Sequence, residues 1–194
     1  MPRPLPAHPV DPSAALPGAD RAAFAAAHAD MAVACAFLAG RVARGLRGAP
    51  ASVIAVRHAA NCLRELDRFL VVMIDACTAG RQPPQGTRAV YCREPDAAGR
   101  LRRAGPLRAR FAGEIARLRA IGRLLALANG AYPAEAGCRP QTDLGLAMRG
   151  AGEPGRQAAA TLLLDDHALA VVAGYYLTLA DRLQALISGA DRAG

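Results

Sequence analysis

The stretch Ser52–Ala79, SVIAVRHAANCLRELDRFLVVMIDACTA, decides the fold because its apolar residues repeat at helical spacing. At roughly 100° per residue, one side of a helix collects Cys62, Leu66, Phe69, Leu70, Met73 and Cys77. The opposite side collects Arg57, Asn61, Arg64, Arg68 and Asp75. Ser52 follows Pro50 and is a suitable N-cap. The sequence therefore predicts an amphipathic helix over about 52–79 with one face against a core.

Similar patterns predict a helix on each side of this stretch. Asp20 is a suitable N-cap for an alanine-rich helix over about 20–45. Its expected buried stripe is Phe24, Met31, Cys35, Leu38 and Val42. A third helix is expected from about 99 or 106 to 129, because Asn129-Gly130 is a typical helix end. Its expected stripe is Leu107, Phe111, Ile115, Leu118 and Leu125.

The last helix is expected from Asp165 or Asp166 to about Ile187. It is apolar almost all round between Leu169 and Leu179, which predicts the most buried element. A brief extended segment, ATLLL at 160–164, is expected before it.

The composition favours helices, since aromatic residues are 4% of the 194 and alanine, leucine and valine must fill the core. We expect one all-α domain over 19–190, an irregular four-helix bundle with two long loops at 80–98 and 130–157. Residues 1–18 are proline-rich, which predicts a disordered or loosely packed arm.

Positive charge is concentrated in one segment. The net charge is +8, and Arg88–Arg123 holds ten arginines against three acids, which accounts for +7 of it. If these side chains converge, guanidinium groups would bind phosphates of RNA or DNA. The candidate residues are Arg102, Arg103, Arg108, Arg110, Arg117 and Arg119. A solvated polar face is the alternative interpretation.

No standard enzyme motif is present, so we expect a non-enzymatic protein without a cofactor or a metal. His58 and Glu65 lie two helical turns apart on one side of the helix, so they could form an acid/base pair. Alternatively, each residue simply lies at the edge of the apolar face. Asp165 and Asp166 before His167 suit capping of a helix better than metal binding. A hydrolase using His58 or His167 is the remaining catalytic alternative.

The five cysteines are Cys35, Cys62, Cys77, Cys92 and Cys138. Their odd number, wide spacing and lack of an adjacent histidine indicate reduced thiols in a cytoplasmic protein. The proline-broken N-terminus lacks the apolar region of a signal peptide, and we expect no membrane partner.

Arg123 and Asn129, in RLLALANG, stand at the end of the third helix, and TLLLDDHALAVVAGYYL follows the loop. This arrangement resembles HEPN-type all-α proteins, whose nuclease members carry an Arg-x(4–6)-His motif at such a place. The resemblance covers about 70 residues. It implies a member with a degenerate motif and without nuclease activity, because an asparagine amide cannot exchange a proton near neutral pH. An ordinary helix end explains the same two residues.

Two functions are therefore expected. The leading one is an interaction or regulatory module that binds a protein partner or forms a homodimer through its alanine-rich helices. The alternative is an RNA- or DNA-binding protein that uses the arginine-rich third helix.

Overall fold

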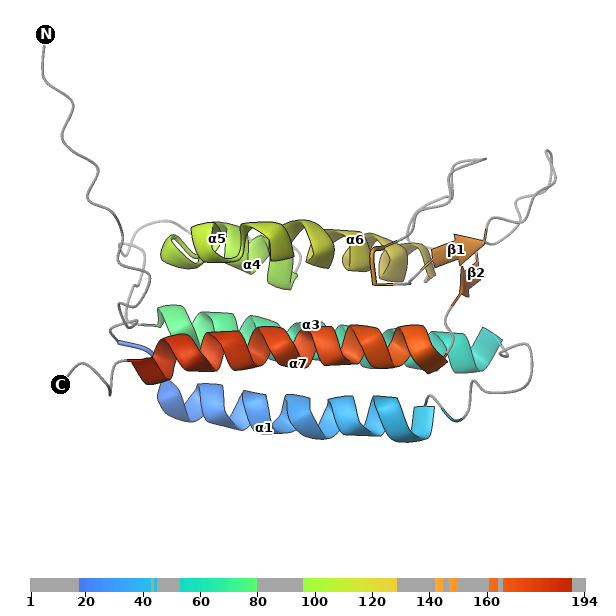
Figure 1. Ribbon diagram of the computed structural model, residues 1–194, viewed down its shortest axis with the longest axis horizontal. Helices are drawn as coiled ribbons and strands as arrows, with labels where there is room; N and C mark the ends of the chain where they lie inside the picture. The colour runs from blue at the N-terminus through green and yellow to red at the C-terminus, as the bar shows by residue number, and fades with distance from the viewer. Residues whose placement is uncertain are drawn as a thin grey trace, which may run out of the picture.

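The protein is all-α, apart from one short pair of strands. The computed structural model describes residues 18–42, 44, 53–79, 96–128, 142–144, 147–149, 161–163 and 166–189. The helices lie in three layers (Figure 1), with α1 outermost on one side, α3 and α7 in the middle, and α4, α5 and α6 on the other side. Within the described segments there are six α-helices, where four were expected.

The helix α1, Arg21–Phe37, begins where the sequence predicted. The side chain of Asp20 accepts a hydrogen bond of 3.0 Å from the backbone nitrogen of Ala23, as an N-cap does. A π-helical turn, Leu38–Val42, extends the helix at its C-terminal end. The buried residues are Phe24, Ala27, Met31, Cys35 and Leu38, which confirms the expected stripe over this stretch.

The middle layer consists of α3, Val53–Thr78, and α7, Asp166–Ser188, which pack against each other and against α1. Leu63, Leu66 and Leu70 of α3 are fully buried, whereas Cys62 and Phe69 are half-buried at the edge of the predicted face. The Cys35 thiol donates to the carbonyl of Ala173 at 3.3 Å, which joins α1 to α7.

The expected third helix is divided into three segments, α4 Ala97–Arg103, α5 Pro106–Arg110 and α6 Ala112–Ala128. The first break lies at Gly105, whose φ of 45° suits glycine, and at Pro106, which occupies the first turn of α5. The second break lies at Phe111, where φ is −117°. This division accounts for the six α-helices among the described residues, where four were expected.

The strands β1, Ala147–Arg149, and β2, Thr161–Leu163, pair antiparallel, with Met148 opposite Leu162. The extended segment predicted before the last helix is thus confirmed for 161–163. The proline-rich arm at 1–17, most of the loops at 80–98 and 130–157, Cys92, Cys138, Asn129 and Asp165 lie outside the described residues.

The buried residues of all three layers belong to one hydrophobic cluster. It includes Leu107, Phe111, Ile115, Leu118 and Leu125, the whole predicted stripe of the third helix. Burial of these side chains holds the outer layer against α3 and α7, and it fixes which faces of α4 and α6 meet solvent.

Candidate functional site

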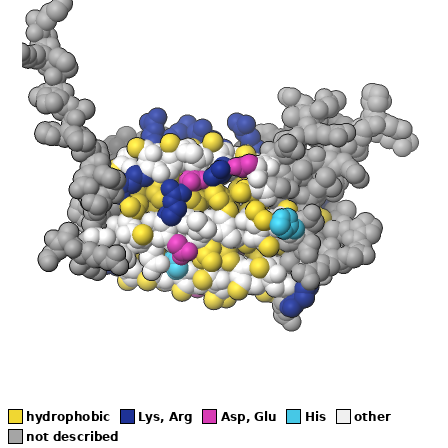
Figure 2. Space-filling view, in the orientation of Figure 1, with side chains coloured by type: hydrophobic (Ala, Val, Ile, Leu, Met, Phe, Trp, Pro, Cys, Tyr) yellow, Lys and Arg dark blue, Asp and Glu magenta, His cyan; other side chains and the backbone are white. Residues whose placement is uncertain are grey.

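The solvent side of the α4–α6 layer carries a group of exposed arginines. Figure 2 shows the arginine side chains gathered along this rim of the molecule. We call the group the arginine face and define it as Arg102, Arg103, Arg108, Arg119 and Arg123. Within the described part of the chain, Arg102, Arg108, Arg119 and Arg123 form no ion pair, so their guanidinium groups face water. Four of the six arginines predicted from the sequence are thus exposed on the α4–α6 layer.

Arg119 and Arg123 lie one helical turn apart on α6, and both side chains are exposed. Residues at this spacing are neighbours on a helix surface. The two like charges repel each other unless an anion lies between them. Arg123 is also the arginine of the predicted degenerate motif, whose second residue, Asn129, lies outside the described residues.

The two other predicted arginines have structural contacts. Nε of Arg117 lies 2.6 Å from a carboxylate oxygen of Asp143, and Nη1 lies 3.3 Å from Glu114. Arg110 is half-buried, and its carbonyl accepts a hydrogen bond from Arg182 at 3.5 Å. These arginines connect the α4–α6 layer to α7 and to the turn at 142–144, so they are poorly placed to bind a ligand.

The carboxylate of Glu114 is the centre of this connection. It pairs with Arg182 of α7 at 2.6 Å and accepts a hydrogen bond from the Tyr175 hydroxyl at 3.2 Å. Burial raises the pKa of Glu114. The hydrogen bond and charge of Arg182, together with the hydrogen bonds from Arg117 and Tyr175, lower this pKa by more than burial raises it, so the net shift is downward. The spacing of three residues to Arg117 indicates only an ion pair within α6, which the structure contains. The structure shows a network across two helices.

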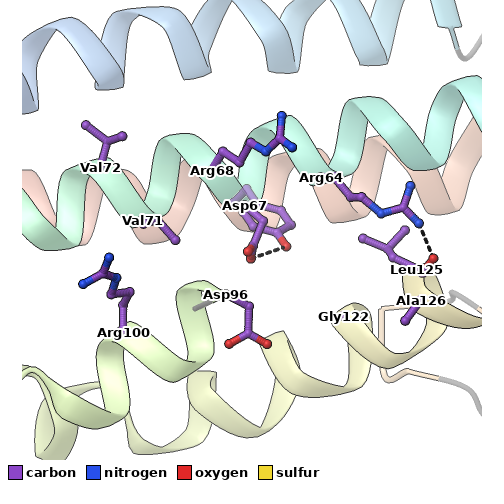
Figure 3. A pocket seen from close by; sticks show the side chains of 11 residues that line it. Arg64, Asp67, Arg68, Val71, Val72, Asp96, Arg100, Gly122, Leu125 and Ala126 are labelled. Carbon is purple, nitrogen blue, oxygen red and sulfur yellow. Dashed lines mark hydrogen bonds between the residues drawn. The ribbon is translucent and has the colours of Figure 1, made fainter. Parts of the chain in front are cut away.

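A pocket of about 680 Å³ lies between α3 and the α4–α6 layer, with Tyr176 of α7 at its floor. Figure 3 shows its charged residues, which are Arg64, Asp67, Arg68, Asp96 and Arg100. The pocket and the arginine face share no residue, although Arg119 and Arg123 lie on α6 one helical turn before the pocket residues Gly122 and Ala126.

Asp67 holds three elements together at this pocket. One carboxylate oxygen accepts from the Tyr176 hydroxyl at 3.2 Å, and the other accepts from the backbone nitrogen of Ala97 at 3.1 Å. Burial raises the pKa of Asp67, the bonds from Ala97 and Tyr176 oppose this, and the nearby charge of Asp96 adds to it. The hydroxyl of Tyr176 is itself fully buried, and its pKa is raised well above the ordinary value for the same reason.

Sequence reasoning missed Asp67, Asp96, Arg100 and Gly122 as pocket residues. One signal was available: Asp67 lies on the same side of α3 as the buried Leu63, Leu70 and Ile74, where a charged residue needs partners. Which side chains would face it across the interface cannot be inferred from spacing along one helix.

The candidate catalytic residues are dispersed. His58 and His167 are exposed, and neither lines the pocket. Glu65 pairs with Arg68 at 2.7 Å. Within the described segments, no group of three His, Cys, Asp or Glu side chains is placed to hold a metal ion.

The expectation that no cysteine has a neighbouring histidine is wrong for Cys62, whose Sγ lies 3.8 Å from Nε2 of His58. The two residues are one helical turn apart, a contact that adjacency in sequence does not reveal. Burial raises the pKa of Cys62, and the charge of Glu65 raises it further, while a backbone hydrogen bond lowers it. The thiol is therefore not activated as a nucleophile.

No protein-family model matches the chain, and neither does any curated protein or solved structure.

Proposed function

We propose that the protein is a non-enzymatic interaction module that binds RNA or DNA through the arginine face. The single observation that carries the proposal is the exposure of Arg102, Arg108, Arg119 and Arg123 without an ion pair among the described residues. Natural surfaces usually mix both signs of charge. A face of arginines alone is suited to a partner that supplies negative charge along its length.

The expected contacts are with phosphates and not with bases. Guanidinium groups bind phosphate oxygens bidentately, and each contact releases counterions from the nucleic acid. The only aromatic residue of α4–α6 is Phe111, which is 2% exposed and lies under the guanidinium of Arg182. A base would find no aromatic surface for stacking on this layer, so binding is expected to show little sequence preference.

The experiment compares the salt dependence of binding between variants of the full chain. Replacing both Arg119 and Arg123 by glutamine removes two phosphate contacts and is expected to lower the slope of log affinity against log salt by about two units. Arg57→Gln is the matched control, because Arg57 is an exposed arginine on α3, outside the arginine face. Equal slopes for the double variant and the wild type would refute the proposal.

The resemblance to HEPN-type proteins stays a prediction. A degenerate member without the motif histidine would fit a non-catalytic role on RNA, and Arg123 would then belong to the arginine face and to the former motif. The support for the proposal comes from the arginine positions and does not depend on this resemblance.

The second candidate function is self-association through the outer face of α1. No described element covers this face in the three-layer arrangement of Figure 1. Its exposed residues recur at spacings of three and four and are Ala22, Ala26, Ala29, Val33 and Phe37. Val33 is 71% exposed and Phe37 is 42% exposed, which is unusual for large apolar side chains next to one another. Small residues between them allow a second copy of the helix to approach closely.

Sedimentation equilibrium tests this candidate. The wild type is expected to form a dimer, and Ala29→Glu is expected to be a monomer because a charge would be buried between the two helices. Ala116→Glu, at an exposed alanine of α6, is the matched control and should leave the dimer intact. A monomeric wild type would refute self-association. Since Arg21–Gly40 is also apolar and long enough to cross a membrane, sedimentation with lipid vesicles is the next measurement in that case.

A further inference from the structure

We propose that the pocket between α3 and the α4–α6 layer binds a small organic carboxylate with an apolar body. A volume of about 680 Å³ lies within the usual range for small-molecule sites. The proposal is independent of the nucleic-acid proposal, because the pocket and the arginine face share no residue.

The charge of the pocket favours an anion. Three guanidinium groups and two carboxylates line it. Arg64 donates to the amide oxygen of Asn61 at 2.6 Å and to the carbonyl of Leu125, and both acceptors are neutral. No described carboxylate forms an ion pair with Arg64, so its charge is not compensated locally. Burial also raises the pKa of Asp67, which disfavours its ionised form.

Arg100 supplies the donor that would hold the carboxylate. Its Nη2 pairs with Asp75 at a long 3.4 Å, whereas its Nε is buried and has no hydrogen-bond partner among the described residues. An unsatisfied buried donor is costly and calls for an acceptor. In Figure 3, the side chain of Arg100 extends from α4 toward α3. A carboxylate at this end would pair with the guanidinium of Arg100, whose side chain is 38% exposed, in a charge-assisted hydrogen bond.

The apolar lining would receive the body of the ligand. Val71 lies at the Arg100 end of the pocket and Leu125 and Ala126 lie at the Arg64 end, with Asp67 and Asp96 between them (Figure 3). Val72 is 45% exposed at the pocket. Gly122 leaves room beside them, since a Cβ there would lie 3.8 Å from Asp96 Oδ2 without a clash. The pocket thus combines an anchoring cation with a non-polar space, which suits an amphipathic acid.

A matched pair of probes tests the proposal, 2-naphthoate and the uncharged 2-naphthamide of nearly the same shape. Calorimetric titration of the full chain is expected to give a Kd for the acid that is lower than the Kd for the amide by about tenfold or more. This ratio corresponds to the free energy of one charge-assisted hydrogen bond. Arg100→Gln should abolish this preference. Arg102→Gln, an exposed arginine of the same helix outside the pocket, should retain it.

A second pair of variants locates the site. Gly122→Leu would fill the pocket and is expected to abolish binding of the acid, while Gly113→Leu, on the same helix with open space around it, should bind normally. Circular dichroism checks that both variants are folded. Equal affinity for acid and amide, binding that survives Gly122→Leu, or no binding of the acid to the wild type would each overturn the proposal.

Discussion

The hydroxyl of Tyr176 on α7 donates a hydrogen bond of 3.2 Å to the carboxylate of Asp67 on α3. Tyr176 is 1% exposed, so neither water nor another donor can easily replace it. The bond therefore links α7 to Asp67 of α3, which also accepts a hydrogen bond from the backbone nitrogen of Ala97, the first residue of α4.

Tyr176→Phe is expected to lower the free energy of unfolding by about 1–2 kcal/mol, because Asp67 would lose a buried donor. Urea denaturation measures this. Tyr175→Phe is the control and should cost less, since Tyr175 is half-buried and Glu114 keeps Arg182 and Arg117 as donors. Equal losses of unfolding free energy for the two variants would show that the hydrogen bond to Asp67 contributes no more to stability than the hydrogen bond of Tyr175.

The stability contributed by Asp67 is expected to rise as the pH falls. Burial holds its pKa in the folded protein above the ordinary value of 3.8, so the folded state binds more protons than the unfolded state between these two values. The contribution is complete below 3.8 and is lost as the pH rises through the raised pKa. Stability measured for wild type relative to Asp67→Asn should increase from pH 7.5 toward pH 4.5. A constant difference would contradict the raised pKa.

Glu114→Gln is expected to destabilise the protein by about 1 kcal/mol at pH 7, a figure reduced for the partial exposure of Arg117 and Arg182. Because the folded pKa of Glu114 lies below its ordinary 4.5, its contribution is present above pH 4.5 and is lost as the pH falls through the lowered value. Glu65→Gln breaks the exposed pair with Arg68 and should cost at most about 0.5 kcal/mol. Thermal denaturation compares the two, and a larger loss for Glu65→Gln would count against the network.

Gly105→Ala is expected to destabilise the protein by about 1 kcal/mol, because a φ of 45° strains any residue with a Cβ. Gly113→Ala is the control, since Gly113 lies inside α6 with open space around it and alanine is the better helix former by about 1 kcal/mol. Opposite signs for the two changes are expected in chemical denaturation. A stabilising Gly105→Ala would show that the break between α4 and α5 is not fixed.

The helices could be predicted because their apolar residues repeat at helical spacing. Phe24, Met31 and Cys35 are buried at the positions expected for α1, and Asp20 caps this helix as its position indicated. The division of the third helix was harder to foresee. Gly105-Pro106 was visible as a possible start, but the short α4 before it depends on Asp96, which accepts a hydrogen bond from Gly99 at 2.7 Å.

The pocket could not be predicted from the sequence. Asp67, Arg100 and Tyr176 come from three helices that are far apart in the chain, and their meeting depends on how α3, α4 and α7 are rotated against one another. The periodicity of one helix says which side is buried and nothing about what lies opposite. The arginine face was easier, because residues that avoid the predicted stripe of α6 must face solvent.

The most direct test of the proposed function is a fluorescence-anisotropy titration of the wild-type full chain with a single-stranded RNA and with a DNA duplex, at about 50 and 200 mM salt. Four phosphate contacts from the unpaired arginines predict binding at the lower salt that weakens about a hundredfold at the higher one. Absence of binding at the lower salt, or an affinity that does not change with salt, would contradict a nucleic-acid-binding role for the arginine face.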